Sequence, residues 1–261
     1  MCVLDNLKKL KPVGKFLLSI SLFVVLWEIL VLFSDLPDFL LPSPRDVGLA
    51  LVEMFTDGTL FVHLFVSLRR FAIAYVISCS IGIVLGVFFG YFKRAWSLFE
   101  PIVLLLKPIS PVAWTPFVML WFGLGEAPAI FTIGIAGFFV MLIATVGAVG
   151  NINSSYMNVA QNFGLTRFQT LYKIVLPASF PYIAQGLRTA LTTSWIFLVA
   201  GELMGVTTGL GFFINNARHI LRSDLIMAGI VIIGIIGFTL EKLLKYVESF
   251  AAKKWGLGTH D

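Results

Sequence analysis

Only a few side chains of this 261-residue sequence could do chemistry, and most of them lie inside long apolar runs. Lys107, Ser110 and Trp114 stand in one proline-rich apolar stretch. Trp195 and Glu202 stand in another. An ionisable or hydrogen-bonding side chain in such surroundings indicates a path for a polar solute, since it is costly to bury in lipid. These five residues are our candidates for a translocation path. The competing interpretation is that they pack in a core or anchor at an interface.

Signatures of catalysis are absent from the sequence. It has no G-x-x-x-x-G-K-[ST] phosphate-binding loop, so this chain is not expected to hydrolyse ATP by that route. It also has no H-E-x-x-H and no G-x-S-x-G. His63, His219 and His260 are scattered, without Cys or carboxylate neighbours at ligand spacing. We therefore predict that the chain is not an enzyme and holds no metal or cofactor of its own.

One polar segment between two apolar runs has a pattern suited to binding another protein. Tyr156–Phe163 can form a short helix that Gly164 would end as a C-terminal cap. Arg167–Val175 then places apolar residues at the i, i+3, i+4 and i+7 positions of a second helix, which we expect Pro177 and Pro181 to end. Such a short amphipathic helix can dock on a partner protein. The alternative is that it lies on lipid headgroups.

The composition places these residues in a membrane protein. Hydrophobic residues make up 58% of the chain and charged residues only 13%, whereas soluble domains carry about 25% charged residues. The apolar runs approach the roughly 20 residues that a helix needs to cross a bilayer. We predict an all-α, polytopic membrane helix bundle with about six transmembrane helices. Their approximate ranges are 16–33, 71–92, 95–122, 127–149, 183–206 and 225–240, and the last helix is expected to continue past Glu241.

Three stretches have additional features. Gly82, Gly86 and Gly90 share one helix face, which lets a second helix approach closely. The stretch 101–116 carries four prolines, so its backbone should be distorted and shielded from lipid. Residues 47–55, in the first polar connection, can form a short amphipathic helix at the surface.

The basic residues predict the orientation. With the N-terminus inside, thirteen of the nineteen Lys and Arg lie on the inner side and five on the outer side. Basic residues favour the cytoplasmic side, so both termini and the segment 150–181 are expected in the cytoplasm. Arg69 and Arg70 run against this trend. The net charge of +5 is explained by the membrane flanks, and no nucleic-acid partner is expected.

The polar segment resembles a motif of ABC importer permeases, E-A-A-x3-G-x9-I-x-L-P. Asn158 and Val159 replace the first two residues of the motif. The positions that match it in register are Ala160, Gly164, Ile174, Leu176 and Pro177. Further stretches resemble the nitrate, sulfonate, taurine and bicarbonate branch of these permeases: L-P-S-P at 41–44, W-F-G-L-G-E at 121–126, L-P-A-S-F-P-Y-I-A-Q-G-L-R at 176–188, A-G-E-L at 200–203 and G-L-G at 209–211.

The resemblance implies a single transmembrane permease domain over 1–261 with a type I importer permease fold. It would comprise an N-terminal span at about 16–33 and a core at about 65–248 that carries the cytoplasmic loop 150–181. Two such subunits, expected as a homodimer with a heterodimer left open, would form the pathway in a bacterial inner membrane. Two cytosolic ATPase subunits would hold ATP and Mg, and an extracytoplasmic binding protein would deliver the solute. The solute would be a sulfonate, taurine, nitrate, a bicarbonate-like ion or a vitamin precursor.

The resemblance also implies the residues that couple the chain to its ATPase, with a coupling helix at about 158–167. They are Asn158, Val159, Ala160, Asn162, Phe163, Gly164, Leu165, Thr166, Arg167, Ile174, Leu176 and Pro177. The first competing interpretation is a secondary transporter or channel without an ATPase partner, which would need coupling-ion carboxylates at the midplane. The second is a membrane-embedded enzyme, which would need clustered His or acidic residues.

Overall fold

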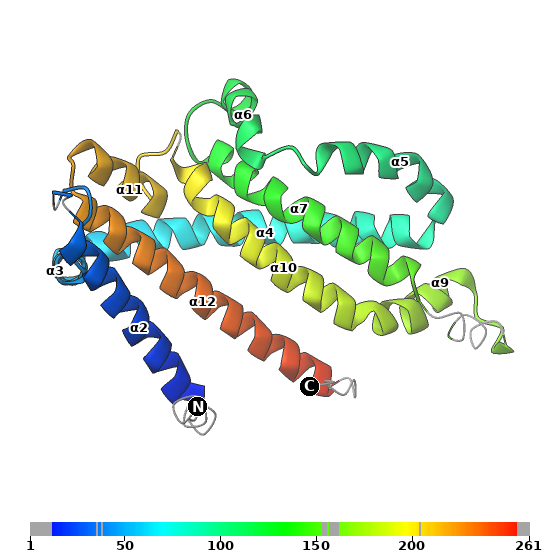
Figure 1. The fold of residues 1–261 in the computed structure, drawn as a ribbon. Helices are drawn as coiled ribbons and strands as arrows, with labels where there is room; N and C mark the ends of the chain where they lie inside the picture. The colour runs from blue at the N-terminus through cyan, green and yellow to red at the C-terminus, as the bar shows by residue number, and fades with distance from the viewer. Residues whose placement is uncertain are drawn as a thin grey trace. The chain divides into compact units, whose positions relative to one another are not determined.

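The computed structural model describes residues 12–34, 36–37, 39–152, 156, 162–203 and 205–254. Within these residues every regular element is a helix and none is a strand, which confirms the all-α prediction. The chain forms two compact units, one of residues 1–61 and 213–232, the other of residues 62–212 and 233–261. Figure 1 gives the order of the helices along the chain.

The first unit holds α2 (Pro12–Phe33) and α3 (Pro44–Thr56), together with the beginning of α12 (Ser223–Lys254). Ser43 and Asp46 form a capping box that starts α3, because each side chain takes part in a hydrogen bond with the other's backbone N–H. The amphipathic helix predicted at 47–55 is confirmed as part of α3. Val47, Ala50 and Met54 on one of its faces are buried, whereas Leu49, Val52 and Phe55 are exposed.

The second unit is built around α7 (Glu126–Gly150) and α10 (Leu176–Glu202), which lie side by side (Figure 1). Gly186 on α10 permits this close packing, because a Cβ added there would lie 2.8 Å from Ala144 Cβ on α7. Gly201 does the same near the other end of α10, where an added Cβ would lie 3.1 Å from the Ala129 carbonyl oxygen. Small residues at such contacts are typical of membrane helix pairs.

The glycine face predicted on α4 (Thr59–Tyr91) packs against α7, as its spacing indicates. Cβ atoms added at Gly82, Gly86 and Gly90 would lie 2.9, 2.5 and 2.7 Å from the Cβ atoms of Met141, Thr145 and Val149, respectively. Larger side chains would therefore force the two helices apart.

An aromatic contact between α4 and α10 forms the centre of the core. The rings of Phe71 and Trp195 meet edge to face, with centroids 5.1 Å apart. The Trp195 indole N–H donates to the Ile233 carbonyl of α12 at 3.1 Å, so this helix joins the same cluster. Ile133 of α7 and Leu198 of α10 complete it and are fully buried.

The proline-rich stretch is a broken helix, and the prediction of one span at 95–122 is wrong in that respect. It consists of α5 (Lys93–Leu106), the 3₁₀ helix η1 (Pro111–Trp114) and α6 (Thr115–Phe122). The two halves are bent by 88°. Proline rings cannot donate the N–H that a continuous helix needs, and Pro108 and Pro111 stand at the break. The predicted backbone distortion is confirmed.

Four helices of the described residues are long and apolar enough to cross a membrane, and a fifth span results if the bent pair is counted as one. Two of them, α2 and α7, are close to their predicted ranges, and α4 begins twelve residues before the predicted 71–92. The last, α12, continues past Glu241 to Lys254, as expected. The span predicted at 183–206 is a helix, α10, but it starts at Leu176 and ends at Glu202. Its 27 residues are long enough to span the bilayer. It is too polar to be counted with the other four.

Candidate functional site

The segment that precedes α10 begins with a sharp turn at Gly164. This residue has a φ of +65°, a left-handed conformation that glycine adopts without strain. The predicted role of Gly164 as a turn residue is thus consistent with its backbone. Most of the helix expected at 156–163 lies outside the described residues.

A capping box follows the turn and starts α9 (Arg167–Thr170). The Thr166 hydroxyl accepts from the Gln169 backbone N–H at 3.3 Å, and the Gln169 side-chain oxygen accepts from the Thr166 N–H at 2.9 Å. The two reciprocal bonds satisfy N–H groups that would otherwise lack partners at the helix start. The turn and the cap together fix the direction in which the chain enters the helix.

The helix then continues without a break from Arg167 to Glu202, so the prediction that prolines end it is wrong. A π-helical turn, η2 (Leu171–Val175), joins α9 to α10. Pro177 lies in the first turn of α10, and Pro181 lies inside the helix. A local π turn can take up the loss of N–H donors at prolines in membrane helices. From Arg167 onward the segment is therefore a helical extension of α10 instead of a loop.

Large apolar side chains of this segment are exposed. Phe163 is 78% exposed and Phe168 is 76% exposed, whereas Val175 is buried. The apolar face predicted for 167–175 is therefore divided, and only its last part packs against the bundle. Exposed phenylalanines this close together are the kind of surface that a partner protein covers.

Two hydrogen bonds connect the segment to neighbouring helices. The Ser179 hydroxyl lies 3.3 Å from the Ala148 carbonyl oxygen of α7. The Tyr91 hydroxyl, at the end of α4, donates to the Arg167 carbonyl at 3.2 Å. The start of the long helix is thus held between α4 and α7.

The structure brings together most of the residues predicted to couple the chain to an ATPase. Asn158, Val159 and Ala160 lie outside the described residues. The exposed or partly exposed members are Asn162, Phe163, Gly164, Leu165, Thr166, Arg167, Ile174, Leu176 and Pro177. Their proposed coupling role stays a prediction.

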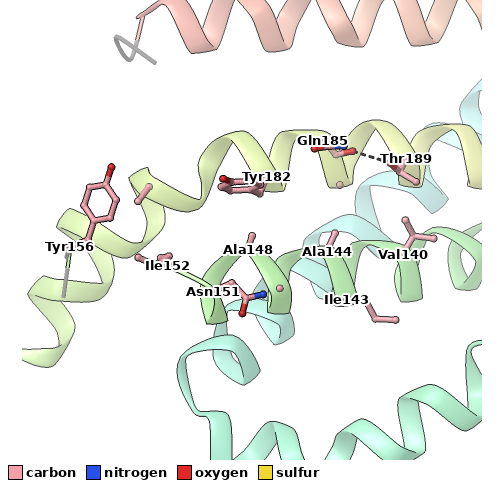
Figure 2. Close-up of a pocket in the computed structure, with 13 residues that line it drawn as sticks. Val140, Ile143, Ala144, Ala148, Asn151, Ile152, Tyr156, Tyr182, Gln185 and Thr189 are labelled. Carbon is pink, nitrogen blue, oxygen red and sulfur yellow. Dashed lines mark hydrogen bonds between the residues drawn. The ribbon is translucent and has the colours of Figure 1, made fainter. Parts of the chain in front are cut away.

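A groove of about 730 Å³ lies beside this segment, between α7 and α10 (Figure 2). Its polar lining consists of Tyr156 and four further residues, Asn151 at the end of α7 and Tyr182, Gln185 and Thr189 on α10. The sequence analysis did not single out any of these four residues. The signal was available, because Gln185 and Thr189 are spaced four apart in a run otherwise rich in apolar residues.

The five residues predicted to line a translocation path are not gathered at one place. Lys107 and Ser110 are exposed at the break between α5 and η1. Trp114 is half-buried at the end of η1. Trp195 belongs to the core, and Glu202 is fully buried at the far end of α10.

Glu202 lies in a network of buried polar groups. Its carboxylate accepts from Arg70 at 3.0 Å, from the Ser67 hydroxyl at 2.7 Å and from the Gly211 N–H at 2.9 Å. Arg70 also donates to Glu126 at 3.2 Å. The pair Arg69 and Arg70, which runs against the charge trend of the sequence, is thus explained by its partners, because Arg69 also pairs with Glu126.

A search of the described residues for three or more His, Cys, Asp or Glu side chains placed to hold a metal ion finds none. The absence of a cofactor stays a prediction.

A comparison of the sequence with family models matches residues 81–249 to the binding-protein-dependent transport system inner membrane component. The chain is 35% identical over 233 residues to a putative ABC transporter permease protein of Methanocaldococcus jannaschii, a match that covers 87% of each chain. It is 32% identical over 235 residues to the taurine transport system permease protein TauC of Escherichia coli. This match covers 88% of the present chain and 86% of TauC.

The fold is also similar to that of solved transporters. An inward-facing structure of the MetNI methionine ABC transporter superposes with a TM-score of 0.57 at 17% identity, over 81% of this chain and 94% of that one. At this identity the likeness concerns the fold alone. The family match begins just before the glycine face of α4 and ends at residue 249, five residues before the end of α12, so it includes the turn at Gly164 and all of α10. The chain therefore belongs to the binding-protein-dependent transport system inner membrane components, the permease components of ABC transporters.

Proposed function

We propose that residues 158–177 dock on a cytosolic ATPase and that movement of this segment is carried into the bundle by α10. The observation that supports this most directly is the unbroken helix from Arg167 to Glu202. Because a helix is stiff along its axis, displacement at its exposed start displaces its buried end. Phe163 and Phe168 supply the exposed apolar surface on which the partner packs.

The energy source in this proposal is the partner, and the chain itself is not catalytic. Each nucleotide state of the ATPase would favour one state of the permease through different contacts with the docking segment. ATP and Mg would be bound by the two ATPase subunits, and this chain would need no cofactor. A second permease copy, as a homodimer with a heterodimer as the alternative, would complete the pathway. An extracytoplasmic binding protein would deliver the solute.

The orientation that we propose has both termini and the docking segment in the cytoplasm of a bacterial cell, and the excess of basic residues on that side supports it. A cysteine introduced as Leu165→Cys should resist a membrane-impermeant thiol reagent added to intact cells, and should react after the cells are opened. The control Thr56→Cys, at the exposed end of α3, should react from outside. Reaction of Leu165→Cys in intact cells would overturn the proposed docking side.

The solute class that we propose is taurine and similar small sulfonates, supported by the 32% identity to the taurine permease of Escherichia coli. Radiolabelled taurine is therefore the probe for the test of function. Proteoliposomes that contain this chain and its ATPase, supplied with the binding protein, should accumulate taurine. Accumulation should require ATP on the side of the membrane where the ATPase is bound. Uptake by this chain alone, driven by an ion gradient, would instead indicate a secondary transporter.

Docking itself can be tested by a matched pair of substitutions. Phe163→Asp removes an exposed ring from the docking segment, and Phe55→Asp removes a 59%-exposed ring from α3. We expect Phe163→Asp to reduce co-purification of the ATPase more than tenfold, since central aromatic residues dominate such interfaces. Phe55→Asp should leave it unchanged. Equal co-purification with both variants would refute the docking surface.

A further inference from the structure

The exposed face of α10 carries a stripe of polar side chains, defined here as Tyr182, Gln185, Thr189 and Thr192. Their spacing of three, four and three residues places them on one side of the helix. All four are exposed within this chain, whereas Ala190 and Ser194 on another side of the helix are buried. This stripe explains why α10 is more polar than the other long helices.

Lipid is an unfavourable neighbour for this face. Transfer of an unpartnered amide into hydrocarbon costs several kcal/mol, and no hydrogen bond reaches the Gln185 side-chain amide from any described residue. The hydroxyls of Thr189 and Thr192 donate to carbonyls one turn earlier, at 3.1 and 3.2 Å, so their oxygens keep free acceptor sites. A row of this kind within a membrane helix should face water.

A second copy of the chain also fits this face poorly. Membrane helices that pack on each other use small residues, and α10 already directs Gly186 toward α7. The stripe begins instead with Tyr182, which is 63% exposed. Beside it lies the groove of about 730 Å³, which is lined by residues of α7 and α10 (Figure 2).

The groove offers hydrogen bonds without a charge. Its described lining contains no Asp, Glu, Lys or Arg. Arg188, the one cation on α10, is three residues from Gln185, and it lies 3.6 Å from Glu248 of α12, which balances its charge. Hydroxyl and amide groups can donate to the oxygens of a sulfonate or carboxylate. Binding without a counter-charge is weak enough to permit release.

From these observations we infer that the stripe Tyr182, Gln185, Thr189 and Thr192 lines the water-filled passage, and that it contacts small oxygen-rich solutes through neutral hydrogen bonds. This inference rests on the proposed transport function and names the side chains that carry it. It places the passage on α10, away from Trp195 and Glu202, which are buried on other faces of the same helix.

The test uses single cysteines in the full chain assembled in membranes, with Cys2→Ser as the parent because the remaining Cys79 is buried. The probe is 2-sulfonatoethyl methanethiosulfonate, an anionic thiol reagent that carries a sulfonate. Gln185→Cys and Thr189→Cys should react at least tenfold faster than the control Val84→Cys. Val84 is 68% exposed on the apolar surface of α4. Excess taurine should slow the reaction at both positions.

Reaction rates equal to that of Val84→Cys would overturn the inference. So would rapid disulfide formation between two copies at Gln185→Cys without labelling, because the face would then be a closed interface. Labelling does not require the ATPase. If the cysteines are labelled but the chain shows no ATP-dependent uptake, the passage is supported and the proposed energy source is refuted. If uptake is normal but the cysteines are not labelled, only the passage is refuted.

The absence of charge is tested by adding one. In the Thr189→Cys chain, Gln185→Glu should slow the anionic reagent at least fivefold relative to Gln185→Leu, and should not slow the cationic trimethylammonium analogue. If Gln185→Glu changes the reaction rates of the two reagents equally, or changes neither rate, a passage along this stripe is contradicted.

Discussion

The guanidinium of Arg70 and the carboxylate of Glu202 lie 3.0 Å apart, although 132 positions separate them in the sequence. Both side chains are buried, with 2% and 0% of their surfaces exposed. The bond joins α4 to the end of α10. The Gly211 N–H at the start of α11 (Leu210–His219) donates to the same carboxylate, so three helices meet at one charged group. These bonds hold the buried end of α10 in place.

Loss of one member of this pair should be more damaging than loss of both. Glu202→Ala leaves the Arg70 charge buried without its main partner, and we expect a loss of about 3–5 kcal/mol in the free energy of unfolding. Arg70→Met combined with Glu202→Met should recover part of that loss, because no uncompensated charge remains. Thermal unfolding of the purified chain in detergent measures both. A double variant less stable than either single variant would contradict this account.

Gly209 should tolerate no side chain, because the chain wraps closely around the Glu202 carboxylate. A Cβ at Gly209 would lie 2.5 Å from the carboxylate, and its φ is +123°. Gly209→Ala is expected to lower stability by roughly 1–3 kcal/mol through overpacking and backbone strain. Gly58→Ala is the matched control, since its φ is +78° but nothing lies within 4 Å of its added Cβ. Equal losses in the two variants would show that crowding contributes nothing.

The turn at Gly164 should distinguish substitutions by backbone preference. Gly164→Pro cannot adopt a φ of +65°, because the proline ring fixes φ near −65°. We expect it to abolish ATP-dependent uptake while membrane insertion stays normal. Gly164→Asn should retain most uptake, because asparagine tolerates the left-handed conformation. The measurement is taurine uptake normalised to the amount of chain in the membrane. Normal uptake by the proline variant would count against a coupling role for this turn.

Contact between α4 and α7 should fail if its glycines are enlarged. Gly86→Leu would place a Cβ 2.5 Å from Thr145 Cβ, and should reduce the amount of folded chain recovered in detergent severalfold. Gly234→Leu on α12 is the control, because nothing lies within 4 Å of its added Cβ. The two variants can be compared by size-exclusion chromatography. Similar recovery of both would mean that the helices separate at little cost.

Much of the fold could be predicted because membrane helices leave simple traces in a sequence. The run at 127–149 is apolar and uninterrupted, and α7 follows it within one residue at each end. Glycines four residues apart on α4 predicted a close helix contact, and the left-handed turn at Gly164 follows from the freedom of glycine. Each of these signals is local, so neighbouring residues suffice to interpret it.

The rest depended on events that local patterns do not encode. Pro177 and Pro181 predict helix ends, yet the helix continues through both, with a π turn at Leu171–Val175 just before Pro177. With a helix end at Pro181, the sequence predicts Tyr182 and Gln185 at the margin of a span. In the structure they lie within α10, on its exposed face. Arg70 had no visible partner, since Glu202 is distant in sequence and is brought to it only by packing.

The contacts between α4 and α7 repeat with the same period on both helices. Gly82, Gly86 and Gly90 meet Met141, Thr145 and Val149, and each series advances by four residues in the same direction. A slide of one such step, about 6 Å along the axis, would therefore put two of the three glycines opposite side chains of the same set. A slide of half a step would bring the side chains of α7 against the larger side chains that lie between the glycines of α4. The contact between α4 and α7 therefore favours discrete registers that are separated by a steric barrier, and it resists smaller displacements along the axis.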